Sequence, residues 1–372
     1  MKRRTFLHTL GAGTLAVGGT LAAGCSPRDQ DSPASTAPTA RGQTHQWKMV
    51  TTWPKNFPGM GTGANYLAKL IGEMSGGRIQ VRVYGANELV PPFEIFDAVS
   101  RGTAEMGHGA SYYWKGKSEA AQFFSAVPFG LTAQEMNAWL YHDGGMELWE
   151  EVYAPFGLIP TAAGNTGVQM GGWFNKEIRS VQDLNGLKMR IPGLGGEVLR
   201  RAGGTPVNLP GGELFTSLQQ GTIDAVEWVG PYNDLAFGLH RAARYYYYPG
   251  WHEPGTTLEC FINQKAFEAL PTDLRSIVKN ACKVANLDML SEYTARNNEA
   301  LRSLVEDHKV QLRLFPDDVL ATLRTMSDEV VADIAARDAL SRKVYESYLD
   351  FRKEAVAWHD LSERAYLNAR GS

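Results

Sequence analysis

Arg190 is the residue whose type and position suggest chemistry most directly. It lies in the predicted strand 187–191 (LKMRI), in which apolar residues alternate with Lys188 and Arg190, and a glycine-rich helix start follows at 193. An arginine at the carboxyl end of a strand suits a carboxylate, because its planar guanidinium donates two parallel hydrogen bonds. The alternative is a solvated surface arginine on the same face as Lys188.

Glu227 is the second such residue. It lies in the predicted strand 223–229, whose residues are mostly apolar, and a carboxylate buried there needs a partner. That partner is an arginine, a hydrogen-bond network or a hard cation. Gln169 offers a further side-chain oxygen, and main-chain carbonyls near Trp228 offer more; such ligands suit Na⁺ or Ca²⁺ rather than zinc. The alternative is a strand-end glutamate that faces water.

No motif in the chain predicts catalysis. The sequence contains no G-x-S-x-G, H-E-x-x-H or P-loop pattern, and the glycines from 193 fail the dinucleotide pattern at Val198. The eight histidines show no metal-ligand spacing. We therefore expect no catalytic residues, while an enzyme with scattered catalytic groups stays an alternative.

An internal repeat predicts the elements that position these residues. In both 91–109 and 210–228, a proline and a glutamate open a short amphipathic helix, a glycine closes it, and a strand follows. Chance is the alternative, since this unit is common. The repeat predicts two similar α/β lobes with mostly parallel sheets, whose ligands sit beyond the carboxyl ends of the strands. The predicted cleft edges are 108–114 and 227–232.

Other periodic segments complete the predicted fold. We expect strands at 47–51 and 79–83, with a helix at 64–74 between them that is stopped by the glycines at 76 and 77. After 263 the pattern is helical, at 265–270, 274–300, 320–336 and 340–367. The Met and Tyr stripes of these helices indicate core or dimer packing.

The first 25 residues predict export. Residues 1–24 carry a basic start with paired arginines and an apolar run, typical of a twin-arginine signal peptide, and 21–25 resemble a lipobox with Cys25 as the lipidated residue. Residues 25–44 are rich in Ser, Thr, Pro and Ala, which predicts a flexible tether. We expect a periplasmic protein held at the membrane by its N-terminal lipid alone.

Charge and cysteine usage exclude some classes of function. The formal charge of −3 becomes −6 for residues 25–372 once the three basic residues of the leader are removed, so nothing favours nucleic acid. The only cysteines after Cys25 are Cys260 and Cys282. A disulfide between them and two free thiols are both open.

The chain resembles a solute-binding protein of the tripartite ATP-independent periplasmic (TRAP) transporters, of the DctP type, in the branch that binds 2-oxo acids and lactate. The resemblance covers 46–350 and is carried by GNTGVQMGGWF, LKMRIPGLGGEVLRRAGGTPV, GTIDAVEWVGPYNDLAFGLH and YYYYPGWHEPG. It implies a two-lobed α/β periplasmic solute-binding protein fold with crossing strands and long C-terminal helices. The expected parts are lobe 1 (45–162), lobe 2 (163–254), a return to lobe 1 (255–300) and C-terminal helices for packing or dimerisation (301–372).

The resemblance also implies a site. Arg190 stands at the position of the arginine that clamps the carboxylate, and Gln169, Glu227 and Trp228 match the ligand and cation site. Tyr112 would contribute from lobe 1, and Glu259 is a weaker candidate for the metal. The sialic-acid branch usually has an arginine near the position of Gln169, so this departure argues against sialic acid.

The function so implied is capture and delivery. The protein would bind a small 2-oxo or 2-hydroxy monocarboxylate with a bridging Na⁺ or Ca²⁺, and deliver it to the large and small membrane subunits of the permease. Aromatic residues, including Trp173 and Tyr113, would cover the apolar part of the ligand. No organic cofactor is expected, and a homodimer formed by helix exchange is one option. The alternatives are an exported enzyme acting on a small organic acid and a ligand-sensing subunit of a signalling system.

Overall fold

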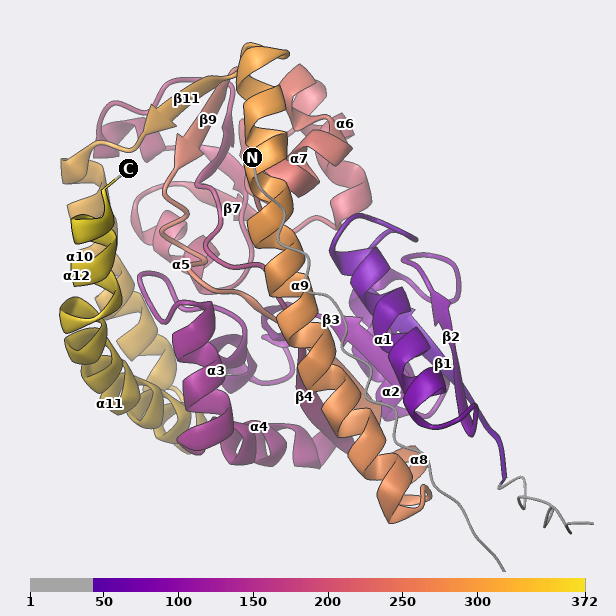
Figure 1. The fold of residues 1–372 in the computed structure, drawn as a ribbon. Coiled ribbons are helices and arrows are strands. Elements are labelled where there is room, and N and C mark those ends of the chain that lie inside the picture. Colours follow the sequence, from indigo (N-terminus) through magenta and orange to yellow (C-terminus); the bar gives the residue numbers. More distant parts are fainter. Residues whose placement is uncertain (1–42, 372) are drawn as a thin grey trace, which may run out of the picture. The chain divides into compact units, whose positions relative to one another are not determined.

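Two β-sheets organise the chain in the computed structural model, which describes residues 43–371 (Figure 1). The signal peptide, Cys25 and residues 25–42 of the expected tether lie outside the described residues. The first sheet has the order β2-β1-β3-β10-β4 and the second β11-β9-β5-β8-β6-β7. The strands of the first are β1 (His45–Thr51), β2 (Ile79–Tyr84), β3 (Met106–Gly109), β4 (Leu158–Asn165) and β10 (Thr257–Asn263). Those of the second are β5 (Gly172–Phe174), β6 (Lys188–Arg190), β7 (Thr205–Val207), β8 (Ala225–Val226), β9 (Tyr245–Tyr248) and β11 (Gln311–Leu314).

The chain crosses from the first sheet to the second and returns to the first. Strands β1, β2 and β3 are parallel, and β10 lies antiparallel between β3 and β4. The chain leaves the first sheet through β4 and returns to it through β10, so all of β5 to β9 lies between these two strands in sequence. In the second sheet β6 is parallel to β7 and β8, while β5 is antiparallel to β8 and β9.

The internal repeat is confirmed. A 3₁₀ turn (Pro92–Glu94), α2 (Ile95–Ser100) and β3 in one copy match a 3₁₀ turn (Gly211–Glu213), α6 (Leu214–Gln219) and β8 in the other. Each helix is followed by a glycine with positive φ, 79° at Gly102 and 72° at Gly221. Glycine takes this conformation without a steric penalty, which explains why it closes both helices.

Long helices cover the sheets, as expected. Helix α1 (Met60–Met74) ends before two glycines of positive φ, and α9 (Thr272–Glu306) contacts α1, β4 and α7 (Pro231–Phe237). Figure 1 shows α9 extending from α8 (Gln264–Glu268) past α1 to α7. The other helices are α3 (Ala133–His142), α4 (Gly145–Tyr153), α5 (Gly193–Arg201), α10 (Asp317–Ala335), α11 (Ala339–Leu361) and α12 (Glu363–Arg370). Segment 301–372 is not purely helical, because β11 pairs in parallel with β9 at the edge of the second sheet.

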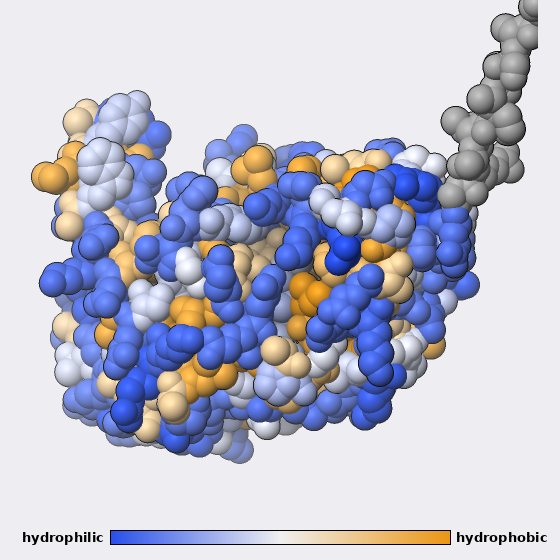
Figure 2. Space-filling model, turned by 90° about the horizontal axis from the view of Figure 1, so that it is seen from below, coloured by the Kyte–Doolittle hydropathy of each residue, from blue (hydrophilic) through white to orange (hydrophobic). Residues whose placement is uncertain are grey.

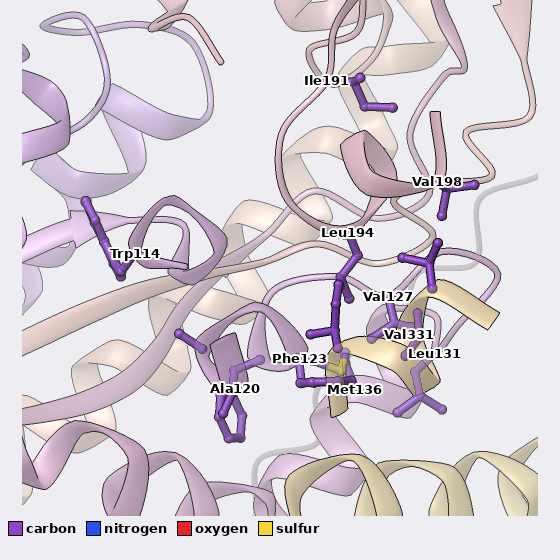
Figure 3. Packing of buried hydrophobic residues seen from close by; sticks show 14 of the residues in the cluster. Trp114, Ala120, Phe123, Val127, Leu131, Met136, Ile191, Leu194, Val198 and Val331 are labelled. Atoms are coloured by element: carbon purple, nitrogen blue, oxygen red, sulfur yellow. The ribbon is translucent and has the colours of Figure 1, made fainter. Parts of the chain in front are cut away.

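The hydrophobic core joins segments that are far apart in sequence. Leu194 and Val198 of α5, which contacts α10, belong to one buried cluster with Val127, Leu131 and Val331 (Figure 3). This packing fixes α5, and with it the turn that follows Arg190. Apolar residues on the face seen in Figure 2 form small separate groups among hydrophilic ones.

The cysteines and the hydropathy of the helices are two further features of the described residues. Cys260 and Cys282 are both buried and both free thiols. Within residues 43–371, no helix combines the length and the apolar character that crossing a bilayer requires.

Candidate binding site

Arg190 is buried at the carboxyl end of β6, with 1% of its surface exposed. Its Nη1 donates to the main-chain oxygen of Glu227 (3.1 Å) and to Oε1 of the same residue. Its Nε donates to the Leu209 carbonyl (3.2 Å) and its Nη2 to the Tyr113 hydroxyl (3.1 Å). Burial disfavours the charge, but Glu227, together with smaller contributions from Tyr113, Tyr112 and Glu253, more than offsets this and raises the pKa of Arg190. The alternative of a solvated surface arginine is wrong.

Glu227 follows directly on β8 and has no exposed surface. The strand is shorter than predicted and ends at Val226, so Glu227 lies beyond its carboxyl end. Its Oε2 lies 3.2 Å from Nε2 of His252, while Oε1 accepts from Arg190. The alternative of a water-facing glutamate is therefore wrong, and the partners that burial requires are an arginine and a histidine.

His252 and Glu253 belong to the same cluster, although the sequence analysis gave them no role. Ligand atoms of Glu227, His252 and Glu253 all lie within 4.8 Å of one another. Burial, reinforced by the charge of Glu227, raises the pKa of Glu253 to about 7. The two residues follow the aromatic run 245–248 in an irregular segment, where no periodicity marks a site.

Gln169 presents an unpaired oxygen to this region. Its Nε2 donates to Oε2 of Glu253 (2.8 Å) and to the hydroxyls of Thr166 and Thr256 (3.1 Å each). Its Oε1 is buried and has no hydrogen-bond partner among the described residues. A buried amide oxygen without a donor is costly, which suits a site completed by a ligand.

The oxygen atoms of this cluster fit a hard cation. The cluster offers the Gln169 amide oxygen and two carboxylates, and oxygen ligands of this kind are what Na⁺ and Ca²⁺ prefer. When Glu227 and Glu253 are both ionised, their two negative charges exceed the single positive charge of Arg190, so a cation would also balance the buried charge.

Aromatic residues enclose the site. The Arg190 guanidinium lies 5.0 Å from the ring of Trp228, whose Nε1 is buried without a partner in the described chain. Tyr112 packs edge-on against Tyr113, with ring centroids 4.8 Å apart. Burial and the charges of Glu253 and Glu227 raise the pKa of Tyr112 well above its usual range. A cavity of about 200 Å³ lies between these tyrosines and the start of α5 at Gly193.

The structure places Trp173 in the core instead. Trp173 stacks on Tyr246 at 4.0 Å, and its Nε1 donates to Asp234 (2.9 Å). Its strand β5 lies between β8 and β9, so its ring is fully covered.

Glu259 is also placed away from the cluster, which corrects the weaker metal candidate. Its carboxylate accepts from Nε1 of Trp114 and from the Tyr153 hydroxyl (2.8 Å). Strand β10 pairs Glu259 with Gly109 and turns its side chain toward these two aromatic residues. Burial raises the pKa of Glu259 to about 8.

Residues 49–338 match the model of the DctP family, described as bacterial extracellular solute-binding proteins, family 7. The chain belongs to this family. The two-lobed α/β fold and the resemblance to TRAP solute-binding proteins that the sequence predicted are thereby confirmed.

Close relatives carry informative names. A monocarboxylate 2-oxoacid-binding periplasmic protein from Nostoc sp. is 44% identical over 372 residues, 100% of both chains. A TRAP periplasmic solute-binding protein from Pseudoalteromonas atlantica, solved with bound sodium and pyruvate, is 46% identical with a TM-score of 0.85. One from Colwellia psychrerythraea, solved with calcium and pyruvate, is 47% identical with a TM-score of 0.86. Each of the two matches covers 88% of this chain. The matched part is 99% of the Pseudoalteromonas atlantica chain and 100% of the Colwellia psychrerythraea chain.

Proposed function

We propose that this protein is the extracytoplasmic substrate-binding subunit of a TRAP transporter, and that it captures a small, pyruvate-like or lactate-like monocarboxylate together with Na⁺ or Ca²⁺. The observation that carries the proposal is a buried arginine beside a cluster of unsatisfied and acidic oxygen ligands. An arginine and a cation together recognise a carboxylate with a neighbouring 2-oxygen. The names of the relatives from Nostoc sp., Pseudoalteromonas atlantica and Colwellia psychrerythraea support this ligand class.

Different residues of the site bind the ligand carboxylate, the cation and the apolar part of the ligand. Arg190 binds the ligand carboxylate through its guanidinium fork, and Gln169, Glu227, Glu253 and the Trp228 carbonyl hold the cation. A bound cation supplies positive charge that attracts one carboxylate oxygen and the 2-oxygen, which selects acids with a 2-oxo or 2-hydroxy group. Trp228, Tyr112 and Tyr113 enclose the short apolar remainder, so the enclosure also limits ligand size.

Movement of the lobes admits the ligand. Arg190 and Glu227 are almost completely covered, so a ligand reaches them only when lobe 1 (45–162 and 255–300) and lobe 2 (163–254) separate. Closure excludes water and strengthens the charge interactions in the site. The closed, loaded protein then delivers its cargo to the permease subunits.

Calorimetric titration tests the proposal. Purified protein should bind one equivalent of pyruvate, another 2-oxo acid or lactate when Na⁺ or Ca²⁺ is present, and the acid should remain chemically unchanged after hours of incubation. Absence of binding for all these acids would refute the proposal. Formation of a product would favour the exported enzyme instead, and loaded protein that fails to drive uptake through the permease would favour a sensor.

The N-terminus and the C-terminal helices support two subsidiary proposals. We propose that the lipid on Cys25 tethers the periplasmic protein near its permease, in which case Cys25→Ala should be exported but freely soluble. We also propose a homodimer formed through α11 and α12, because α11 exposes Trp358 and Leu361 at 65% and 79%, and α12 exposes Tyr366 at 64%. Native mass spectrometry should detect the dimer.

A further inference from the structure

The hydrogen bonds of Arg190 leave too few donors for a carboxylate ligand. A guanidinium has five N–H donors, and Arg190 makes four hydrogen bonds, to the Leu209 carbonyl, the Tyr113 hydroxyl and two oxygens of Glu227. One donor is left without an acceptor in the described chain. A bidentate grip on a carboxylate requires two parallel N–H groups, so at least one existing bond must break first.

Release of Oε1 of Glu227 would give Arg190 the second N–H of a parallel pair. Tyr113 occupies only Nη2, which already has the free N–H, so the second N–H must come from Nε or Nη1. The bond from Arg190 to the Leu209 carbonyl and that to the Glu227 main-chain oxygen are anchored in the backbone. The bond to Oε1 of Glu227 is held by a side chain, which can turn without moving the strand. If Glu227 turned away with no cation present, it would keep the 3.2 Å contact with His252 but lose the ion pair with Arg190, at the cost that an unpaired buried charge carries.

We infer that the Glu227 carboxylate masks Arg190 until a cation arrives, so that cation binding must precede or accompany capture of the acid. The inference rests on the proposed function and adds an order of events to it. When Glu227 turns toward a cation held by Gln169 and Glu253, Nη1 of Arg190 becomes free and faces the ligand carboxylate. Glu227 thus acts as a switch as well as a cation ligand.

Thermodynamic linkage gives this switch a measurable signature. Cation and acid must raise each other's affinity by the same factor, which for coupled sites is typically about 5- to 150-fold. A Glu227 that only held the cation would show the same coupling in the native protein. The two roles predict different effects when Glu227 is removed. Only a masking Glu227 weakens acid binding in the absence of the cation, so only in that case does its removal raise the affinity for the acid in cation-free buffer.

The test measures pyruvate affinity by calorimetry in buffer free of Na⁺ and Ca²⁺, with the full mature chain. Glu227→Ala should bind pyruvate about 10-fold or more tighter than the native protein under these conditions, within the usual range for site coupling, and added cation should raise its affinity by a smaller factor than in the native protein. Glu227→Gln, which keeps an oxygen near Arg190 but not the charge, should lie between the two. This second variant serves if the alanine variant does not fold.

A matched control separates unmasking from a general change in charge. Asp234 is another buried carboxylate that interacts with the charge of Glu227, but its bonds go to Trp173 and Tyr246 and not to Arg190. Because burial raises the pKa of Asp234 to about 7, the assays are run at pH 8, where it is charged. Asp234→Asn should leave cation-free pyruvate affinity as in the native protein.

The outcomes distinguish the two hypotheses. If neither Glu227 variant gains cation-free affinity, or if Asp234→Asn gains as much, the masking role is refuted while the proposed function stands. If the native protein binds none of the 2-oxo or 2-hydroxy acids even with Na⁺ or Ca²⁺, the proposed function itself fails.

Discussion

Replacement of Arg190 by lysine tests the geometry of the site most directly. The change keeps a positive charge next to Glu227 but removes the planar fork. A lysine ammonium cannot reach the Leu209 carbonyl, the Tyr113 hydroxyl and Glu227 at once as Arg190 does. Alanine would be a poorer probe, because a buried carboxylate left without its partner costs about 3–5 kcal/mol of stability.

The expected loss follows from the hydrogen bonds. If a ligand carboxylate accepts two parallel bonds from Arg190, lysine removes one charge-assisted bond, worth about 1.5–3 kcal/mol. The dissociation constant for pyruvate should therefore rise by roughly 10- to 150-fold. Loss of the charge-assisted bond to the Leu209 carbonyl should also lower the free energy of unfolding, by about 1.5–3 kcal/mol.

Calorimetry with saturating cation and urea denaturation together provide the assay. Arg201→Lys is the control, because Arg201 also lies on α5 but its side chain pairs with Glu329 and Asp333 of α10. The control should bind pyruvate normally. An Arg190→Lys variant that binds pyruvate as tightly as the native protein would refute the bidentate grip.

Three further predictions concern stability and assembly. Burial raises the pKa of Glu259 from 4.5 to about 8, so between these pH values the folded state holds a proton that the unfolded state has lost. The free energy of unfolding should therefore fall as the pH rises from about 4.5 to about 8. Urea denaturation should show a smaller fall for Glu259→Gln. In Gly107→Ala the new Cβ would lie 2.2 Å from the Phe261 ring, which should lower the free energy of unfolding by about 1–3 kcal/mol. In Gly116→Ala the new Cβ would have no atom within 4 Å, so the free energy of unfolding should stay unchanged in the same assay. If the exposed Trp358 supports a dimer, Trp358→Glu should shift the native mass spectrum to monomer; an unchanged dimer would refute this interface.

Local patterns were enough to predict most of the elements. The repeat at 91–109 and 210–228 is visible because proline, glycine and apolar spacing act within a few residues, and the structure shows the same turn, helix and strand in both copies. The helices after 263 were predicted for the same reason. Strand β11 was missed, because four residues form a strand only when β9 is beside them.

The site was predicted in part. Arg190 and Glu227 are conspicuous as charges in apolar strands, and the structure buries both and pairs them. His252 and Glu253 carry no such signal, since they lie in an irregular segment after β9. Glu259 was indistinguishable from a cation ligand in sequence, although the register of β10 directs it to Trp114 and Tyr153.

The sequence by itself determined the class of the protein and the residue types available to its site. It specified an α/β chain with a repeated unit, an arginine for a carboxylate, and oxygen ligands suited to a hard cation. Tertiary structure alone decided which charges meet. The pairing of Arg190 with Glu227, and of Gln169 with Glu253, joins residues 37 and 84 positions apart. Such pairings depend on strand order and on packing between distant segments, which no local pattern encodes.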